Sequence, residues 1–477
     1  MFEKIGWQNI SKQKTEYLLL GFFLVIRLLS FLTYHHPILN QLLALPLVGI
    51  FVYITIKDLN KSWLLLVTEL TIDGAGHFFE LQGLILRTWF LGIFACGWLI
   101  KKIKERKINT NLPRPLLGGL IAATLIVVLA GILGFVHGHQ TNVIFQDAIL
   151  YFFILLVFPA LDFNTEYQTK YFKSLIKIFV IGSLLFAAIS FIIYSTQLGY
   201  LPDTYYHWFR NVAAGKITDL GYHFFRIVLP EQLLAVPLIV IITSYLIREY
   251  KNKLLWILLT CLLVILSLNF SRIYFLGLIF GLIPLIFKNK FSHWLRVSAS
   301  IGILFIGIFF LINFTASRFQ SFGLETLGLR VNGQAQTEVS SAIRLAMLPD
   351  IFNTIKKHPF FGSGLATTVS YPDPVTKEIV SRTQFDWGYF EMIAELGIIG
   401  TLIFIGFILT ILYYLARQAY FSSTNNPLLP GLFGGALSLF VINLTTPALF
   451  QGFGVLYFVF LIYIIQYGTS ANPKISS

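Results

Sequence analysis

Long apolar segments recur along the whole chain, and this pattern restricts the fold more than any other feature. A helix of about 20 apolar residues crosses the hydrocarbon core of a bilayer, and such segments begin near Tyr17 and recur as far as Tyr467. Only 12% of the residues are charged, whereas soluble domains have about 25%. The sequence therefore predicts an all-α, polytopic transmembrane helical bundle that forms one integral membrane domain over residues 1–477.

About 12 to 14 spans are predicted, because helices of this kind need roughly 20 residues each. The apolar run 254–287 is too long for one span at about 1.5 Å per residue, so we place a turn at Asn269–Ser271. The segment 62–78 contains Glu69, Asp73 and His77 and is also compatible with a re-entrant or surface position. The predicted spans are 17–34, 39–56, 62–78, 83–100, 116–135, 145–160, 173–194, 230–248, 253–270, 272–287, 295–314, 391–416, 428–446 and 452–467.

The positions of Lys and Arg predict the orientation of these spans. With both termini in the cytoplasm, the short outer loops contain no Lys or Arg, as the positive-inside rule requires. Two long loops, 195–229 and 315–390, then lie outside. No small-residue cleavage site follows the first apolar run, which we interpret as a retained span. The net charge of +13 reflects topology and attraction to anionic lipid, and its scatter over loops on both faces does not predict nucleic-acid binding.

A few charged residues fall near or within the spans, where each costs about 2.5 to 3.5 kcal/mol. Glu69 and Asp73 are one helical turn apart, and we expect them to pair with Arg27 or Arg87. Arg272 lies at the tip of an outer hairpin. There a guanidinium is suited to bind a diphosphate through two hydrogen bonds.

The second outer loop begins with a predicted amphipathic helix over 339–357, lying on the membrane surface and bent at Pro349. Pro359 ends this helix. Gly362 and Gly364 then permit a tight turn with a close backbone approach to a ligand. The alternative is a surface helix with a glycine cap.

Metal binding is not expected. His358 is explained by the helix end that precedes Pro359, and no second His or Cys has suitable spacing. Cys96 and Cys261 both lie in apolar runs, which does not favour a disulfide or a zinc site.

The loop closes on Asp386, which precedes Trp387, Tyr389 and Phe390. Aromatic residues of this kind are typical of the membrane interface. A carboxylate beside them would be partly desolvated and suited to act as a general base. The alternative is that Asp386 caps the helix that follows. One turn apart at the start of that helix, Glu391 and Glu395 are expected to pair with a basic loop residue.

These motifs, taken in order, resemble the O-antigen polymerase and ligase family of bacterial envelope glycosyltransferases. The resemblance is strongest over residues 250–415 and elsewhere extends only to the hydropathy profile. It rests on Ser271-Arg272, Arg344, His358-Pro359-x-x-Gly362-x-Gly364 and Asp386-x-x-Tyr389-x-Glu391 followed by Gly397-x-x-Gly400.

The resemblance implies a GT-C-like glycosyltransferase in the bacterial plasma membrane, without a metal or cofactor. Its donor and acceptor would be undecaprenyl-diphosphate-linked glycans at the outer leaflet, and its partners a chain-length regulator and a flippase. Ligase members usually have His where this chain has Asp386. We therefore predict a polymerase of O-antigen, capsule or exopolysaccharide repeat units, with a ligase as the alternative. A flippase is the alternative from another class, although the halves 1–230 and 231–477 show no internal repeat.

The resemblance also implies roles for individual residues. Arg272 and Arg344 would bind the diphosphate and stabilise its developing charge, while Asp386 would take the proton of the attacking hydroxyl. Arg226, in the first outer loop, is a candidate third phosphate contact. The remaining candidate substrate-binding residues are Gly362, Gly364, Tyr389 and Glu391.

Overall fold

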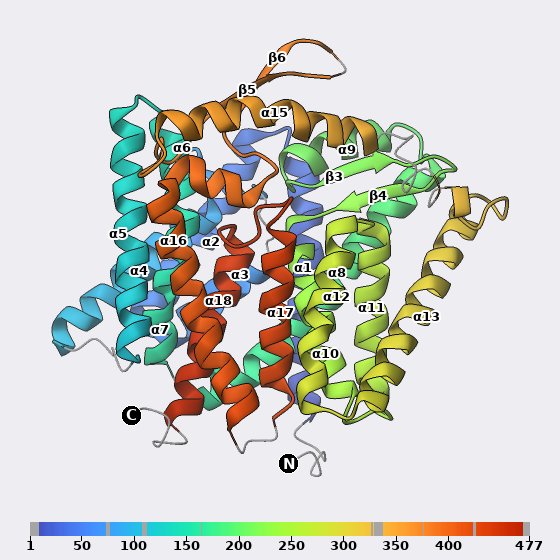
Figure 1. Ribbon diagram of the computed structural model, residues 1–477, viewed down its shortest axis with the longest axis horizontal. Coiled ribbons are helices and arrows are strands. Elements are labelled where there is room, and N and C mark those ends of the chain that lie inside the picture. Colours follow the sequence, from blue (N-terminus) through green and yellow to red (C-terminus); the bar gives the residue numbers. More distant parts are fainter. Residues whose placement is uncertain are drawn as a thin grey trace. The chain divides into compact units, whose positions relative to one another are not determined.

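The described part of the chain is a set of helices with three short β-hairpins (Figure 1). The computed structural model describes residues 9–72, 77–106, 112–163, 165–325, 328, 337–374, 376–422 and 426–470. Contacts divide the chain into two compact units. Unit 1 comprises Met1–Asn109, Asp162–Ala235 and Thr260–Phe270, and unit 2 comprises Thr110–Leu161, Val236–Leu259 and Ser271–Ser477.

Unit 1 contains the first helices and two of the hairpins, β1 with β2 and β3 with β4, both antiparallel. In the second hairpin Thr218 pairs with Arg226. Its elements are α1 (Asn9–Thr33), α2 (Pro37–Lys57), α3 (Leu59–Ile72), β1 (Glu80–Leu81), β2 (Leu84–Ile85), α4 (Leu86–Glu105), α8 (Thr165–Thr196), α9 (Leu201–Asn211), β3 (Lys216–Asp219), β4 (Phe225–Val228), the 3-10 helix η2 (Pro230–Leu234) and the second part of α11 (Lys253–Asn269).

Unit 2 contains the large loop and the C-terminal helices. The third hairpin, β5 with β6, pairs Val369 with Arg382. The elements of this unit are α5 (Arg114–Val136), α6 (Thr141–Phe152), η1 (Phe153–Leu156), α7 (Val157–Asp162), α10 (Ala235–Leu246), the first part of α11, α12 (Arg272–Leu282), η3 (Ile283–Lys288), α13 (Phe291–Ala316), α15 (Thr337–Lys357), β5 (Val369–Pro372), β6 (Ile379–Arg382), α16 (Gly388–Ala416), η4 (Arg417–Phe421), α17 (Leu428–Ile442) and α18 (Gly452–Ser470).

The helices confirm the prediction of a mostly helical, polytopic membrane protein. Among the described residues, six helices are long and apolar enough to cross a membrane, and five shorter helices are also apolar. The segments predicted at 62–78, 83–100 and 272–287 are in neither group of the described helices. The sequences of α3 and α4 contain charged residues, which lower their hydropathy. Helix α12 ends at Leu282, and the 3-10 helix η3 (Ile283–Lys288) follows it. The six long spans are Pro37–Lys57, Arg114–Val136, Thr141–Asp162, Tyr171–Thr196, Phe291–Ala316 and Gly388–Phe421.

The turn predicted at Asn269–Ser271 is confirmed, because α11 ends at Asn269 and α12 begins at Arg272. In unit 2, α12 then packs closely on α17. A Cβ at Gly277 would collide with the side chain of Ile442, and one at Gly281 with the backbone of Gly434. Small residues at such contacts let two helix backbones approach each other.

Buried ion pairs in unit 1 compensate for charges inside the apolar helices. Arg87 contacts Glu69 at 3.3 Å, which is one of the predicted pairings. Arg27 contacts Glu231 at 3.7 Å, a carboxylate that the sequence did not indicate as its partner. The predicted partner Asp73 lies outside the described residues. Buried charges of this kind are tolerated only when they are paired.

Candidate active site

The centre of the candidate site is an ion pair between the large loop and the residues that lead into α16. Nε of Arg344, in α15, donates a hydrogen bond to Oδ2 of Asp386 at 3.0 Å. The two side chains are 28% and 45% exposed, respectively. The sequence predicted a partly desolvated carboxylate at Asp386, because aromatic residues follow it. In the structure this carboxylate is accessible to solvent. It also makes no capping hydrogen bond to α16, whose N-cap residue is Trp387.

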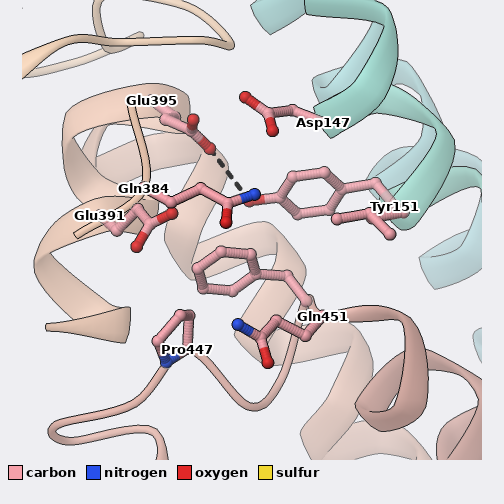
Figure 2. A pocket seen from close by; sticks show the side chains of 9 residues that line it. Asp147, Tyr151, Gln384, Glu391, Glu395, Pro447 and Gln451 are labelled. Carbon is pink, nitrogen blue, oxygen red and sulfur yellow. Dashed lines mark hydrogen bonds between the residues drawn. The ribbon is translucent and has the colours of Figure 1, made fainter. Parts of the chain in front are cut away.

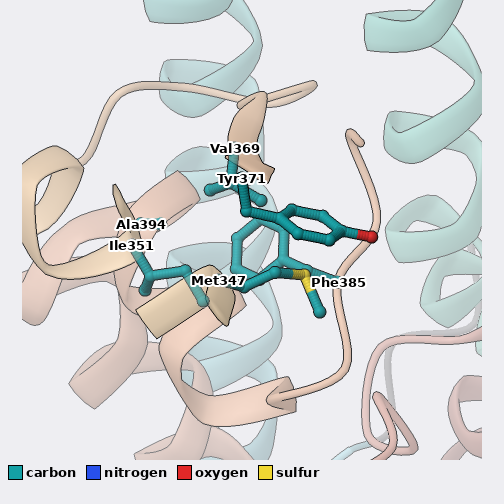
Figure 3. Close-up of a cluster of buried hydrophobic side chains, with 6 residues drawn as sticks. All are labelled: Met347, Ile351, Val369, Tyr371, Phe385 and Ala394. Atoms are coloured by element: carbon teal, nitrogen blue, oxygen red, sulfur yellow. The ribbon is translucent and has the colours of Figure 1, made fainter. Parts of the chain in front are cut away.

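A hydrophobic cluster holds α15 in place (Figure 3). It contains Met347 and Ile351 from α15, Tyr371 from β5, and Phe385 from the segment before α16, all of them at most 2% exposed. In addition, Nε1 of Trp387 donates to the carbonyl oxygen of Arg344 at 3.0 Å. The predicted helix is confirmed, but its apolar face packs on the protein instead of the membrane surface. The ion pair thus joins two segments that the core already fixes.

Pro349 lies inside α15, as the sequence predicted, and the helix continues through it to Lys357. Of the apolar side chains on this helix, Leu345 is 61% and Phe352 is 42% exposed. These outward positions are available to lipid or to a partner.

Gly362 and Gly364 serve the fold directly. Both have positive φ, at 75° and 94°, which favours glycine. A Cβ at Gly362 would collide with the backbone of Glu395 and Gly397, and one at Gly364 with the backbone of Gly134. The predicted close approach therefore exists, but its partner is the chain itself and not a ligand.

This turn breaks α16 at Gly397, where φ is 70° and ψ is 177°. The amides of Ile398 and Ile399 donate to the carbonyl oxygens of Pro359 and Phe360, at 2.9 and 3.2 Å. In return, the amides of Ser363 and Gly364 donate to Ala394 and Glu395, at 2.7 and 3.1 Å. Backbone groups that a kinked helix leaves without intrahelical partners are thereby satisfied. The first two turns of α16 are held at an angle fixed by the 359–364 segment.

Three histidines surround the same turn. Nδ1–H of His137 donates to the carbonyl oxygen of Ser363, and Nδ1–H of His139 donates to that of Leu365, both at 2.7 Å. The ring of His358 lies 4.6 Å from that of His137. Desolvation, followed by the neighbouring His137, Lys357 and His139, lowers the pKa of His358. The imidazoles thus tie the end of α5 to the loop.

A small cavity lies beside the kink, and three carboxyl groups face it (Figure 2). Its volume is about 10 Å³, and its lining includes Asp147, Glu391, Glu395, Tyr151 and Gln384. A space of this size holds one water-sized group. The hydroxyl of Tyr151 donates to Oε2 of Glu395 at 3.3 Å, and the amide of Phe385 donates to Oε2 of Glu391 at 3.3 Å. The predicted pairing of these glutamates with a basic residue is therefore wrong.

One of these carboxyl groups is incompletely satisfied. Asp147 is 6% exposed, and among the described residues its Oδ2 has no hydrogen-bond partner. Sequence reasoning missed this residue, although an aspartate inside the apolar run 145–160 was a visible signal. Such a group normally has a partner, so this oxygen can accept a hydrogen bond in the cavity.

The other predicted residues lie in other elements, and two of them donate hydrogen bonds to backbone carbonyl groups. Tyr389 directs its hydroxyl to the carbonyl oxygen of Phe440 at 2.8 Å. Arg272 is the first residue of α12, in unit 2. Arg226 belongs to unit 1, where its Nε donates to the carbonyl oxygen of Asn269 at 2.7 Å.

Within the described residues, no group of three or more His, Cys, Asp or Glu side chains is arranged to hold a metal ion. The buried acidic cavity includes Gln384 and Glu391, which are close in sequence to Asp386. The site therefore combines one guanidinium, one accessible carboxylate and a cavity of hydrogen-bond acceptors.

Comparison with known proteins places this region in a family. The family model described as O-Antigen ligase matches residues 255–405, which include α12, α15, the 359–364 segment, Asp386 and the kink at Gly397. No curated protein matches the chain. Members of the matching family are glycosyltransferase-like enzymes. Over residues 255–405, the chain is therefore similar to the O-antigen polymerase and ligase family of membrane proteins.

Proposed function

We propose that the protein polymerises undecaprenyl-diphosphate-linked oligosaccharide units at the outer leaflet of the bacterial plasma membrane. The observation that carries the proposal is the 3.0 Å contact between Arg344 and Asp386, within the region that matches the family. It unites a group that binds phosphate with a group that accepts a proton. Glycosyl transfer from a diphosphate needs both.

The proposed reaction breaks the bond between the anomeric carbon and the diphosphate oxygen. Oxygen of the acceptor hydroxyl forms the new bond to that carbon, and its proton passes to the Asp386 carboxylate. The lipid diphosphate leaves with the bonding electron pair. Arg344 and Arg272 stabilise its charge, an effect worth about 3 to 4 kcal/mol for a single well-placed donor.

The ion pair also supplies an order of events. Arg344 carries further N–H donors beyond the Nε–H that contacts Asp386. A diphosphate that recruits this guanidinium would draw it from the carboxylate, which is then available to the acceptor hydroxyl. Arg226 and Tyr389 are retained as candidate substrate contacts only if substrate displaces their present hydrogen bonds to backbone carbonyls.

The acidic cavity supports a site for acceptor hydroxyl groups. Carboxylates accept hydrogen bonds from hydroxyls and a carboxamide both donates and accepts them, while Tyr151 and Phe450 supply aromatic surface. Glu391 and Asp147 are the residues we assign to this contact. The segment from Gln384 to Asp386 connects the cavity directly to the ion pair.

A polymerase is favoured over a ligase by the resemblance described above, because ligase members usually have His at the position of Asp386. A ligase that transfers glycan to another lipid acceptor is the second candidate, and the same ion pair would serve it. A flippase finds no support in the family match.

Reconstituted vesicles test the three functions together. Purified protein is incubated with lipid-linked repeat units, and the products are separated by size. A polymerase produces a ladder of longer lipid-linked glycans, a ligase produces glycan on an added second acceptor only, and a flippase changes sidedness without a new bond. Formation of the ladder should continue in EDTA, and a loss restored by magnesium would contradict the metal-independent reaction.

A further inference from the structure

A second cavity lies in unit 2, at the end of α13 that is remote from α15. Its volume is about 440 Å³. Arg248 reaches it from the segment after α10, Lys288 from the end of η3, and Lys290, His293 and Arg296 from the start of α13. Three separate segments therefore bring basic side chains to one concave surface.

Among the described residues that line this cavity, none is acidic. The nearby Glu249 accepts a hydrogen bond from Asn252 at 3.0 Å and does not line the cavity. The positive-inside rule explains why basic residues are frequent in these connections. The rule does not explain why basic side chains from three segments line one cavity. Like charges repel each other at this separation, and a bound anion would remove the repulsion.

Within unit 2, the cavity lies at the end of α13 that is remote from α15, the helix of Arg344 (Figure 1). It opens at the start of α13, and this helix of 26 residues rises about 39 Å before its end at Ala316. The chain then enters the large loop. Figure 1 shows α15 crossing the upper ends of the unit 2 helices, whereas the start of α13 lies at their lower ends. One phosphate cannot occupy both sites.

Aromatic residues are close in sequence to the residues that line the cavity. Phe287 is 77% exposed and Phe291 is 59% exposed, while the rings of Phe291 and Trp294 stack at 5.5 Å. Tyr250, in the lining itself, is 42% exposed. Aromatic residues beside cationic ones are typical of the boundary between lipid tails and water.

We propose that this cavity binds a phosphate-bearing anion at the membrane face opposite the glycosyl-transfer site. Arg296 and Arg248 provide planar donors for two phosphate oxygens, and Lys288 and Lys290 provide compact charges. The phosphate can belong to an anionic lipid head group, since basic pockets between transmembrane helices bind such groups. It can also belong to a soluble phosphate compound, and the experiment separates these sources.

The test uses the full chain, delipidated in detergent, with two probes. Native mass spectrometry measures retention of phosphatidylglycerol, with phosphatidylcholine as the neutral reference, and calorimetry measures binding of inorganic pyrophosphate. The cavity variant is Lys290→Gln with Arg296→Gln. The matched control, Lys251→Gln with Lys253→Gln, removes the same charge from exposed positions in the neighbouring connection. Should the cavity variant fail to fold, each single change replaces it.

We expect saturable binding of phosphatidylglycerol that the cavity variant weakens roughly thirtyfold and the control variant leaves nearly unchanged. The site would belong to a soluble phosphate compound if the cavity variant weakened pyrophosphate binding but left phosphatidylglycerol binding unchanged. Equal losses in both variants for both probes, or no saturable binding of either probe, would overturn the proposal.

Discussion

Arg344 and Asp386 are separated by 42 residues of sequence, yet Nε of the arginine lies 3.0 Å from Oδ2 of the aspartate. The contact is partly open to solvent, while the helix and the segment that carry it are anchored in a buried cluster. The proposed glycosyl transfer would require such rigid supports under an accessible pair of charges, because misplacement of the reacting groups is costly.

Asp386→Asn should stop chain growth, because an amide cannot take the proton of the acceptor hydroxyl. General bases contribute about 10² to 10⁴-fold to rate, so single lipid-linked units should accumulate in membranes. Extraction of lipid-linked glycans and separation by size measure this. Glu378→Gln, at an exposed position of the same loop, is the control. Wild-type polymer from the Asn variant would remove the role as base.

Asp147→Asn should weaken binding of the acceptor. Hydrogen bonds to charged groups contribute about 1.5 to 3 kcal/mol, so the KM for acceptor should rise roughly tenfold or more. The variant also removes one of three carboxyl groups from a buried space. Because burial of charge is costly, the thermal midpoint of the variant should not fall. Asp203→Asn, at an exposed position, is the control. An unchanged KM with unchanged stability would count against the acceptor site.

Gly397→Ala should destabilise the protein. The backbone there has φ of 70° and ψ of 177°, a region that costs side-chain residues about 1 to 3 kcal/mol, and a Cβ would also collide with Phe360 and Gly362. Gly406→Ala, in the same helix with no atom near the added carbon, should retain or increase stability. Thermal unfolding in detergent compares them. Equal midpoints would show that the kink is not under this constraint.

Acidification should destabilise the loop through His358. Its folded-state pKa lies below the ordinary value of 6.5, so the unfolded chain binds more protons in that range. The contribution to stability is present above about pH 6.5 and is lost as the pH falls through the folded-state pKa. His358→Gln should therefore flatten the fall in thermal midpoint between pH 7.5 and pH 5. An identical pH profile for wild type and variant would contradict this assignment.

The sequence predicted those features that depend on residues close together in the chain. The length of the run 254–287 required the turn at Asn269–Ser271, and helical periodicity located α15 to within a few residues of Thr337–Lys357. Glu69 and Arg87 were both visible as charges in apolar helices. Motif order also identified the family before any contact was known.

The rest depended on contacts between distant segments. Tyr151 meets Glu395 across 244 residues, and the kink at Gly397 depends on carbonyl groups of Pro359 and Phe360. Periodicity cannot reveal such partners, because it specifies which face of a helix is buried and not what covers it. The same reason explains why the contact of Arg27 with Glu231 was not predicted.

The most direct measurement compares Arg344→Lys with wild type in the vesicle assay. Lysine retains the charge but cannot offer planar, paired donors to carboxylate and diphosphate, so ladder formation should fall about a hundredfold or more. Arg382→Lys, on β6 of the same loop, should polymerise at nearly the wild-type rate. A wild-type ladder from Arg344→Lys, with the protein folded in the membrane, would contradict the account.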